Sequence, residues 1–250
     1  MESRFTISNV LSVSWKALAS QIWILAGLMI GYIILSLILS LVLPPLFSSP
    51  MTGTIVSQLA SVVFALIFNL GYLKNLFQAL DGDEPRLSAY GQQARKIGVY
   101  FVAALLQGIA VSIIVTLFLA PYFYWLFQNS FISEIALDVN GLPLIPEGHG
   151  AALCGILLGT LVLLLPAIYV AIRLMFYQAF IIEEDAGIIE SLKKSWQITK
   201  GQELPLFLLA LVWLGLFIAG FLLFLIGLFV AYPLMLMMYC YTFRQLNRNR

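Results

Sequence analysis

The sequence predicts an all-α integral membrane bundle of six transmembrane helices with both termini in the cytoplasm. Composition is the first observation: of 250 residues, 62% are apolar and only 10% are charged. A soluble domain is typically about 45–50% apolar and about 25% charged, and a globule of this size cannot hide so much apolar surface from water. The low charge and the net charge of +1 also exclude a disordered chain and a nucleic-acid partner.

The second observation is the length of the apolar runs. A helical span needs about 20 apolar residues, because the hydrocarbon core is about 30 Å thick and a helix rises about 1.5 Å per residue. The predicted spans are residues 22–43, 55–80, 97–118, 151–172, 204–221 and 225–243. The last two form one uncharged run of 40 residues, which suits two spans with a turn near Gly220. A tilted, broken helix over 204–243 would reduce the count to five.

The third observation is that the basic residues fall on one side of this arrangement. All 13 lysines and arginines lie in the amino-terminal segment, near the inner end of the second span (Lys74), in the connections after the second and fourth spans, or in the tail. Since Lys and Arg remain on the cytoplasmic side, both termini are predicted to be cytoplasmic. The first apolar run has 22 residues, longer than the core of a cleaved signal peptide. The predicted localisation is therefore the cytoplasmic (inner) membrane.

Three similar amphipathic segments precede the first, third and fifth spans, at residues 11–16, 87–96 and 192–197. Placing Trp15 on Trp196 also aligns Gln21 with Gln202. Short helices with aromatic and basic side chains suit the lipid headgroup layer. The predicted interfacial anchors are Trp15, Lys16, Tyr90, Arg95, Lys96, Lys193, Lys194 and Trp196.

We therefore predict one membrane domain built from three units, at residues 1–80, 81–185 and 186–250, each an interfacial helix followed by a helical hairpin. The alternative is that the segments 11–16, 87–96 and 192–197 resemble one another by chance, as amphipathic segments can.

Two stretches resemble a known family: Arg173 through Glu183-Glu184-Asp185-Ala186-Gly187 to Ser195-Trp196, and Gly71 through Leu80-Asp81-Gly82-Asp83-Glu84-Pro85. The pattern is similar to bacterial six-span membrane proteins of unknown function, and to the membrane domain attached to some glycerophosphodiester phosphodiesterases. In those phosphodiesterases the chemistry belongs to a separate soluble barrel, to which no segment here corresponds. The resemblance therefore implies an architecture and no catalytic residue.

Motifs for catalysis or metal binding are missing from the sequence. The one histidine, His149, lies in the loop between the third and fourth spans, and neither His-Glu-x-x-His nor Cys-x-x-Cys occurs. The segment 81–86 begins like the signature of CDP-alcohol phosphotransferases, but Arg95, Val99 and Ala103 stand where that signature needs a glycine and two aspartates. We predict no enzymatic activity, no cofactor and no metal.

Arg173 is the charged residue of greatest interest near a span, because apolar residues continue for nine positions beyond it. The run 151–182 has 32 residues, which exceeds the thickness of the membrane as one helix. Either the fourth helix projects into the cytoplasm, or Arg173 lies below the membrane surface, paired with Glu183, Glu184 or Asp81.

Prolines and glycines inside spans are the remaining candidates. Pro166 and Pro233 are candidate helix breaks of the kind that transporters use at binding sites. The pairs Gly27-x-x-x-Gly31 and Gly155-x-x-x-Gly159 have the spacing of close helix packing.

The expected function is that of a non-enzymatic integral membrane protein with an accessory, scaffold or lipid-interacting role. Its expected partners are the bilayer and a membrane protein or second copy of the chain. A transporter or channel for a small or amphiphilic substrate is the alternative, and a membrane enzyme acting on lipids is less favoured.

Overall fold

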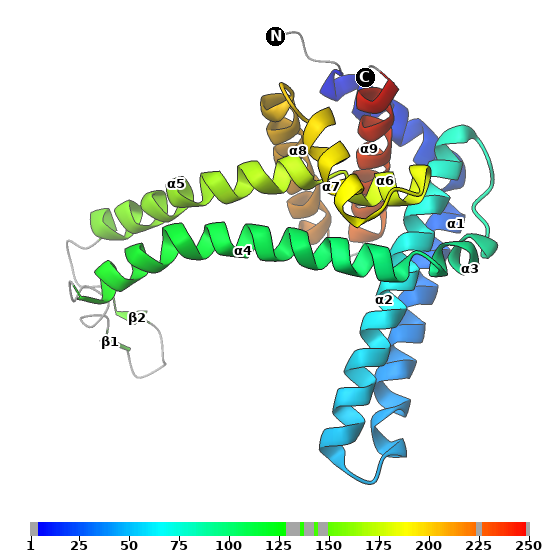
Figure 1. The fold of residues 1–250 in the computed structure, drawn as a ribbon, viewed down its shortest axis with the longest axis horizontal. Helices are drawn as coiled ribbons and strands as arrows, with labels where there is room; N and C mark the ends of the chain where they lie inside the picture. Colours follow the sequence, from blue (N-terminus) through cyan, green and yellow to red (C-terminus); the bar gives the residue numbers. More distant parts are fainter. Residues whose placement is uncertain (1–4, 129–135, 138–142, 145–149, 224–226, 249–250) are drawn as a thin grey trace. The chain divides into compact units, whose positions relative to one another are not determined.

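A computed structural model describes residues 5–128, 136–137, 143–144, 150–223 and 227–248, so His149 lies outside the described residues. These residues are almost entirely helical, which confirms the all-α class (Figure 1). The helices are α1 (Ile7–Val42), α2 (Pro50–Asp81), α3 (Ser88–Ala94), α4 (Ile97–Gln128), α5 (Gly150–Leu174), α6 (Tyr177–Glu184), α7 (Ile188–Ile198), α8 (Glu203–Leu222) and α9 (Leu228–Arg248), with a 3-10 turn at Pro44–Leu46.

Six of these helices coincide with the predicted apolar runs. Within the described ranges, five stretches are long and apolar enough to cross a membrane: Ile7–Leu46, Pro50–Asp81, Ile97–Leu126, Cys154–Glu184 and Glu203–Leu222. The helix at the sixth predicted span, α9, is not among them, because its second half contains polar side chains such as Thr242, Arg244 and Gln245. Because five of its helices are long and apolar enough to cross a membrane, the chain is a multi-pass helical membrane protein.

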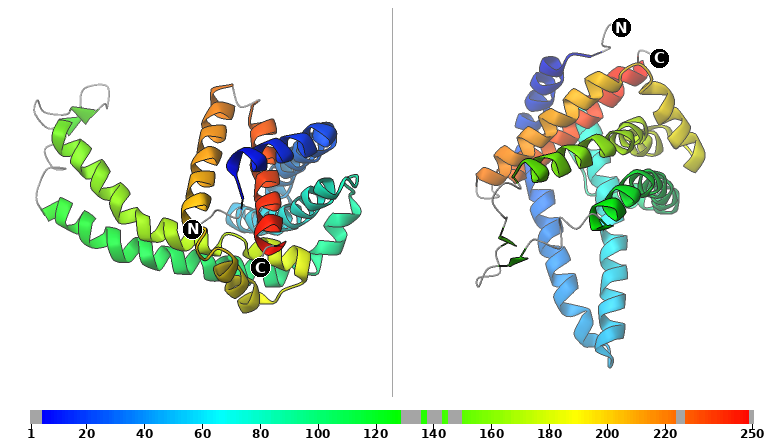
Figure 2. Two further views of the ribbon diagram at one scale, coloured as in Figure 1. Left: turned by 90° about the horizontal axis from the view of Figure 1, so that it is seen from above. Right: turned by 90° about the vertical axis from the view of Figure 1, so that its left-hand side faces the viewer.

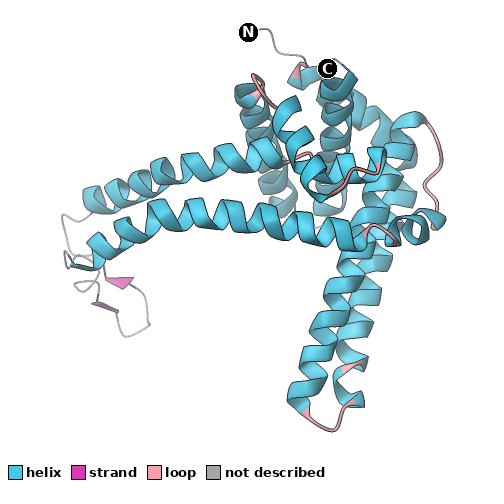
Figure 3. Ribbon diagram, in the orientation of Figure 1, coloured by secondary structure: helices cyan, strands magenta, loops and turns pink. Residues whose placement is uncertain are grey.

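The chain divides into two compact units, residues 1–103 with 175–250, and residues 104–174. In the second unit α4 and α5 lie side by side (Figure 2). The Tyr122 hydroxyl donates to the Ile156 carbonyl oxygen at 3.0 Å, and it would lie 2.7 Å from a Cβ at Gly159. Gly159 thus permits this close contact. The unit also contains two short antiparallel strands, β1 (Ala136–Leu137) and β2 (Pro143–Leu144) (Figure 3).

In the first unit α9 is the central helix and contacts α1, α2 and α8. It buries one face that includes Met237, Met238 and Cys240. The Phe243 ring near its end lies 4.9 Å from the Phe180 ring and 5.9 Å from the Phe77 ring, centroid to centroid. This aromatic cluster joins the ends of α2, α6 and α9, because each helix contributes one fully apolar ring at the same level.

The uncharged run 204–243 forms two helices that pack against each other, rather than one broken helix. A Cβ on Gly227 would lie 2.7 Å from the Gly220 Cα. The lack of side chains at both positions lets α8 and α9 approach each other next to their connection.

The aligned glutamines Gln21 and Gln202 adopt nearly the same backbone conformation. Gln21 has φ −133° and ψ 19° and interrupts α1, while Gln202 has φ −119° and ψ 16° and precedes α8. Each therefore separates a short amphipathic helix from a long apolar one.

The two short helices also bury matching positions. Trp15 and Trp196 are 49% and 40% exposed. The buried positions repeat at every fourth residue in both helices, at Val10, Ser14 and Leu18 and at Ser191, Ser195 and Thr199. The two segments thus pack on the protein through equivalent faces and expose equivalent tryptophans.

The run 151–182 is two helices, since α5 ends at Leu174 and α6 begins at Tyr177. The backbone groups released at this break have partners. The Phe176 N–H donates to Ser195 Oγ at 3.0 Å, and the Tyr239 hydroxyl donates to the Met175 carbonyl oxygen at 3.1 Å. Side chains of α7 and α9 thus replace the hydrogen bonds that a continuous helix would make.

Gly27 and Gly31 line an apolar groove of about 350 Å³ between α1, α2 and α3. A Cβ at either glycine would meet nothing within 4 Å. The floor of the groove includes the stacked rings of Tyr32 and Phe68, 4.1 Å apart. The close helix packing predicted for Gly27-x-x-x-Gly31 is therefore not observed among the described residues.

Candidate functional site

The end of α6 is the centre of a charged network in the first unit. Three acidic residues, Glu183, Glu184 and Asp185, follow buried apolar positions. The helix ends at Asp185 in the left-handed conformation, with φ 51° and ψ 30°, and the Ala186 N–H donates to the Phe180 carbonyl oxygen at 3.2 Å. This tight helix ending gives three successive carboxylates three different sets of partners.

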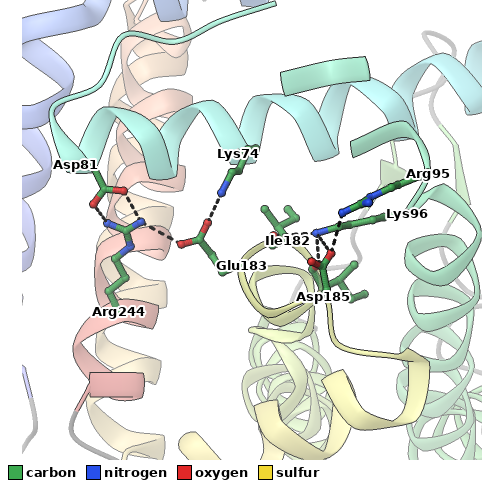
Figure 4. A network of polar contacts seen from close by, with 9 residues as sticks. Lys74, Asp81, Arg95, Lys96, Ile182, Glu183, Asp185 and Arg244 are labelled. Atoms are coloured by element: carbon green, nitrogen blue, oxygen red, sulfur yellow. Dashed lines mark hydrogen bonds and ion pairs between the residues drawn. The ribbon is translucent and has the colours of Figure 1, made fainter. Parts of the chain in front are cut away.

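Glu183 connects α6 to both α2 and α9 (Figure 4). Its Oε1 lies 2.9 Å from Lys74 Nζ, and its Oε2 lies 3.0 Å from Arg244 Nη2. The same guanidinium binds both oxygens of Asp81, with Nη2 2.8 Å from Oδ2. One face of Arg244 also lies over the Phe77 ring, 5.2 Å from Cζ to the ring centroid. Two cations and two carboxylates therefore alternate across three helices.

Glu184 connects α6 to α7 and to the end of α9. Its Oε2 accepts from Lys194 Nζ at 2.9 Å, and its Oε1 accepts from Asn247 Nδ2 at 2.8 Å. Lys194 Nζ also lies 2.7 Å from Glu190 Oε1. Hydrogen bonds from Lys194 and the Gly187 N–H lower the pKa of Glu190, and the two carboxylates raise the pKa of Lys194. Glu190 and Lys194 are thus held in their charged forms near neutral pH.

Lys96 caps α6 from the start of α4. Its buried Nζ donates to the carbonyl oxygens of Ile181 at 2.9 Å and Ile182 at 3.0 Å, and it pairs with Asp185. An ammonium has three donors, so each has an acceptor here. The hydrogen bond from Lys96, reinforced by its charge, lowers the pKa of Asp185. Arg95 Nη2 lies 3.7 Å from the same carboxylate.

The structure brings three sequence-predicted residues, Asp81, Glu183 and Glu184, into this network. Arg173 lies at the end of α5 in the other compact unit, with Cζ 5.8 Å from the centroid of the Tyr169 ring. Its predicted pairing with the three acids stays a prediction. Pro166 lies inside α5 and Pro233 inside α9, and each helix continues past its proline.

The predicted interfacial anchors differ in their surroundings. Lys16 and Lys193 are exposed, as are Trp15 and Trp196. The Tyr90 ring stacks on Phe68 at 5.7 Å between centroids. Lys194, Arg95 and Lys96 bind carboxylates.

Sequence reasoning missed the role of Arg244, which bridges Asp81 and Glu183. One signal was available: Arg244 is the first charged residue after the 40-residue uncharged run. Its partners carry no such signal, because they depend on how α2 and α6 pack against α9.

A pocket of about 610 Å³ adjoins the network within the same unit. Its wall contains carboxylates, guanidinium groups and apolar side chains, contributed by Val13, Ala17, Leu80, Glu183, Glu184, Tyr241, Phe243, Arg244, Gln245, Asn247 and Arg248. The described residues contain no group of three or more His, Cys, Asp or Glu placed to hold a metal ion. The arrangement is suited to holding a ligand that is both charged and apolar.

Long apolar helices with a partly buried ion-pair network at their ends define a multi-pass helical membrane protein. The chain matches the model of a domain of unknown function, DUF7847, over residues 5–244, and it belongs to that family. No curated protein and no solved structure matches it.

Proposed function

We propose that this chain is a non-enzymatic integral membrane protein of the bacterial cytoplasmic membrane, with an accessory, scaffold or lipid-interacting role. The observation that supports the proposal is the equivalent placement of Trp15 and Trp196, each exposed and directly following a buried serine, Ser14 or Ser195. Tryptophan is enriched at membrane–water interfaces, where its ring is at the headgroup level. Short helices with outward tryptophans thus suit a protein that acts at the lipid surface. The resemblance to a phosphodiesterase-associated membrane domain agrees with an accessory role.

The proposed topology has six spans, including α9, with three hairpins and both termini inside. The ion pairs favour this arrangement, because Asp81–Arg244 and Lys74–Glu183 bring together the connections after the second and fourth spans and the tail. Those are the segments in which the basic residues are concentrated. Their position at one level agrees with a common cytoplasmic side.

Cysteine labelling in oriented vesicles tests the topology. In a background with Cys154→Ser and Cys240→Ala, which removes both cysteines, one cysteine is introduced by Asp83→Cys, Lys193→Cys or Glu134→Cys. An impermeant maleimide should label the Asp83 and Lys193 variants only in inside-out vesicles, and the Glu134 variant only in right-side-out vesicles. The cysteine-free background is the control. Labelling of the Glu134 variant only from the cytoplasmic side would refute the topology.

Fluorescence quenching tests the interfacial placement. The chain has five tryptophans, and variants that keep one each, with phenylalanine at the other four, isolate Trp15, Trp196 or Trp213. We expect lipids brominated near the headgroup end of the acyl chain to quench Trp15 and Trp196 equally, and more than lipids brominated near the chain terminus. Trp213, in the middle of α8, is the matched control and should show the opposite preference. If Trp15 and Trp196 behave like Trp213, or are not quenched by either lipid, the proposed function fails.

A further inference from the structure

The pocket beside α9 has two chemically different walls. One is apolar and is formed by Val13 and Ala17 of the first segment of α1 and by Leu80 at the end of α2. The other is polar and is formed by Glu183 and Glu184 at the end of α6 and by the last two turns of α9. A ligand that fills this pocket must therefore be amphiphilic.

Most charges in the polar wall already have partners of opposite sign. Glu183 binds Lys74 and Arg244, and Glu184 binds Lys194. Arg248 is the exception among the charged lining residues, since it makes no ion pair with any residue that the structure describes. The Arg248 guanidinium can therefore bind an anionic group of a ligand in the pocket.

Tyr241 adds a hydrogen-bond donor on the same face of α9. Its oxygen accepts from Asn9 Nδ2 at 3.2 Å and from Gln245 Nε2 at 2.9 Å. With both lone pairs engaged, the hydroxyl proton remains to be donated into the pocket. Tyr241 and Arg248 are seven residues apart, about two helical turns, so both side chains project from one side of α9. A guanidinium and a hydroxyl donor together suit a phosphate.

We infer that this pocket binds the headgroup of a phospholipid that carries a primary ammonium, as phosphatidylethanolamine does. The inference rests on the proposed function, which places this end of the helices in the headgroup layer. The phosphate binds Arg248 and Tyr241, the ammonium binds the carboxylates of Glu183 and Glu184, and the acyl chains follow the apolar wall along α1 and α2.

The lining residues distinguish between classes of headgroup. A primary ammonium donates hydrogen bonds, and each carboxylate oxygen can accept more than one. A trimethylammonium donates none and is typically bound in a cage of aromatic faces, whereas the only aromatic lining residues are Tyr241 and the buried Phe243. An anionic headgroup without an amine would bind Arg248 and Tyr241 but would leave the remaining acceptor capacity of the two carboxylates unused. The pocket therefore favours a zwitterionic headgroup with hydrogen-bond donors.

Native mass spectrometry of the full chain in detergent measures this preference directly. The purified protein is titrated with phosphatidylethanolamine, phosphatidylcholine or phosphatidylglycerol of matched acyl chains. We expect the ethanolamine lipid to bind roughly tenfold more tightly than either competitor, the ratio that about one additional charge-assisted hydrogen bond produces.

Three substitutions locate the site. Tyr241→Phe, Arg248→Gln and Glu184→Gln should each weaken binding of the ethanolamine lipid, by roughly fivefold to tenfold. Glu184→Gln should also reduce the preference over phosphatidylcholine, because the ammonium loses a charged acceptor. Arg86→Gln is the matched control, since Arg86 is exposed and is not a lining residue. In a Cys154→Ser background, the temperature at which the buried Cys240 thiol becomes reactive verifies that each variant is folded.

Each outcome of the titration has a definite meaning. Equal binding of phosphatidylcholine, tighter binding of phosphatidylglycerol, or no effect of the three substitutions in folded protein would overturn the inference. These measurements need no bilayer, so their failure leaves the proposed function standing if Trp15 and Trp196 are quenched at the headgroup level. Deep or absent quenching removes the proposed function whatever the lipid preference.

Discussion

Replacing Arg244 by methionine should lower the stability of the protein by about 1–3 kcal/mol, because the mostly buried Glu183 carboxylate loses one of its two cations and a hydrogen bond to a charged group contributes about 1.5–3 kcal/mol. The pair with the exposed Asp81 adds less, since solvent screens it. Arg244 binds Asp81 through both guanidinium nitrogens and Glu183 through one. Methionine retains much of the apolar stem over Phe77 but leaves both carboxylates without this cation. Arg244→Lys should be intermediate, since an ammonium cannot bind Asp81 through two parallel hydrogen bonds.

The buried thiol of Cys240 provides the measurement. With Cys154→Ser, Cys240 is the only cysteine, and its reaction with a thiol-specific fluorophore on heating reports unfolding of α9 in detergent. Because Cys240 is close to Arg244 in the chain, the fraction of protein that stays monodisperse after heating is the second readout.

Lys193→Met is the matched control for Arg244→Met, because Lys193 is an exposed cation outside the α2–α6–α9 contact. It should unfold at the temperature of the parent protein. The stability lost by the double variant Arg244→Met with Asp81→Asn should be less than the sum of the stabilities lost by the two single variants, since the two residues share one interaction. Unfolding of Arg244→Met at the parent temperature would show that the bridge does not stabilise the fold.

Replacing Gly71 by alanine should destabilise the contact of α2 with α3 by about 1–3 kcal/mol, the usual cost of overpacking. A Cβ at this position would lie 2.3 Å from Cδ1 of Tyr90 and 2.8 Å from its Cα. The ring can turn away, but the backbone of α3 cannot give way without separating from α2. We therefore expect the loss to be near the upper end of that range, measured by the same thermal exposure of Cys240.

Gly27→Ala is the matched control for Gly71→Ala. Both glycines are within long apolar helices, but a Cβ at Gly27 meets nothing within 4 Å. Alanine there should leave the stability unchanged or raise it by about 0.5–1 kcal/mol, because glycine loses more backbone freedom in a helix. The stability lost by the double variant Gly71→Ala with Tyr90→Ala should be less than the sum of the losses of the two single variants, since the contact of the new Cβ with the ring disappears and its contact with Cα remains. Equal unfolding temperatures for the Gly71 and Gly27 variants would contradict the close α2–α3 contact.

The long helices could be predicted closely because lipid imposes a local rule on the sequence. The described α2, α4, α5 and α8 contain the predicted runs 55–80, 97–118, 151–172 and 204–221 completely. Each residue that faces hydrocarbon must be apolar, and every backbone group must be hydrogen-bonded within its own helix. A continuous apolar run therefore predicts a helix without knowledge of its neighbours.

The interruption of the run 151–182 could not be predicted in this way. Neither glycine nor proline stands near Met175 and Phe176, so the sequence there has no local sign of a helix end. The break depends on Ser195 and Tyr239, which supply hydrogen-bonding groups from α7 and α9. Such partners are known only after the chain has folded.

The sequence by itself determined that the protein is of the all-α class, that it belongs in a membrane, and where its long helices run, because these properties depend on consecutive residues. Only the tertiary structure decided which charges meet. Arg244 is 163 residues from Asp81 and 61 from Glu183, and their pairing follows from the packing of the Phe77, Phe180 and Phe243 rings beneath them. Apolar contacts position these helix ends first, and the charged side chains then bind whichever partners that packing places within reach.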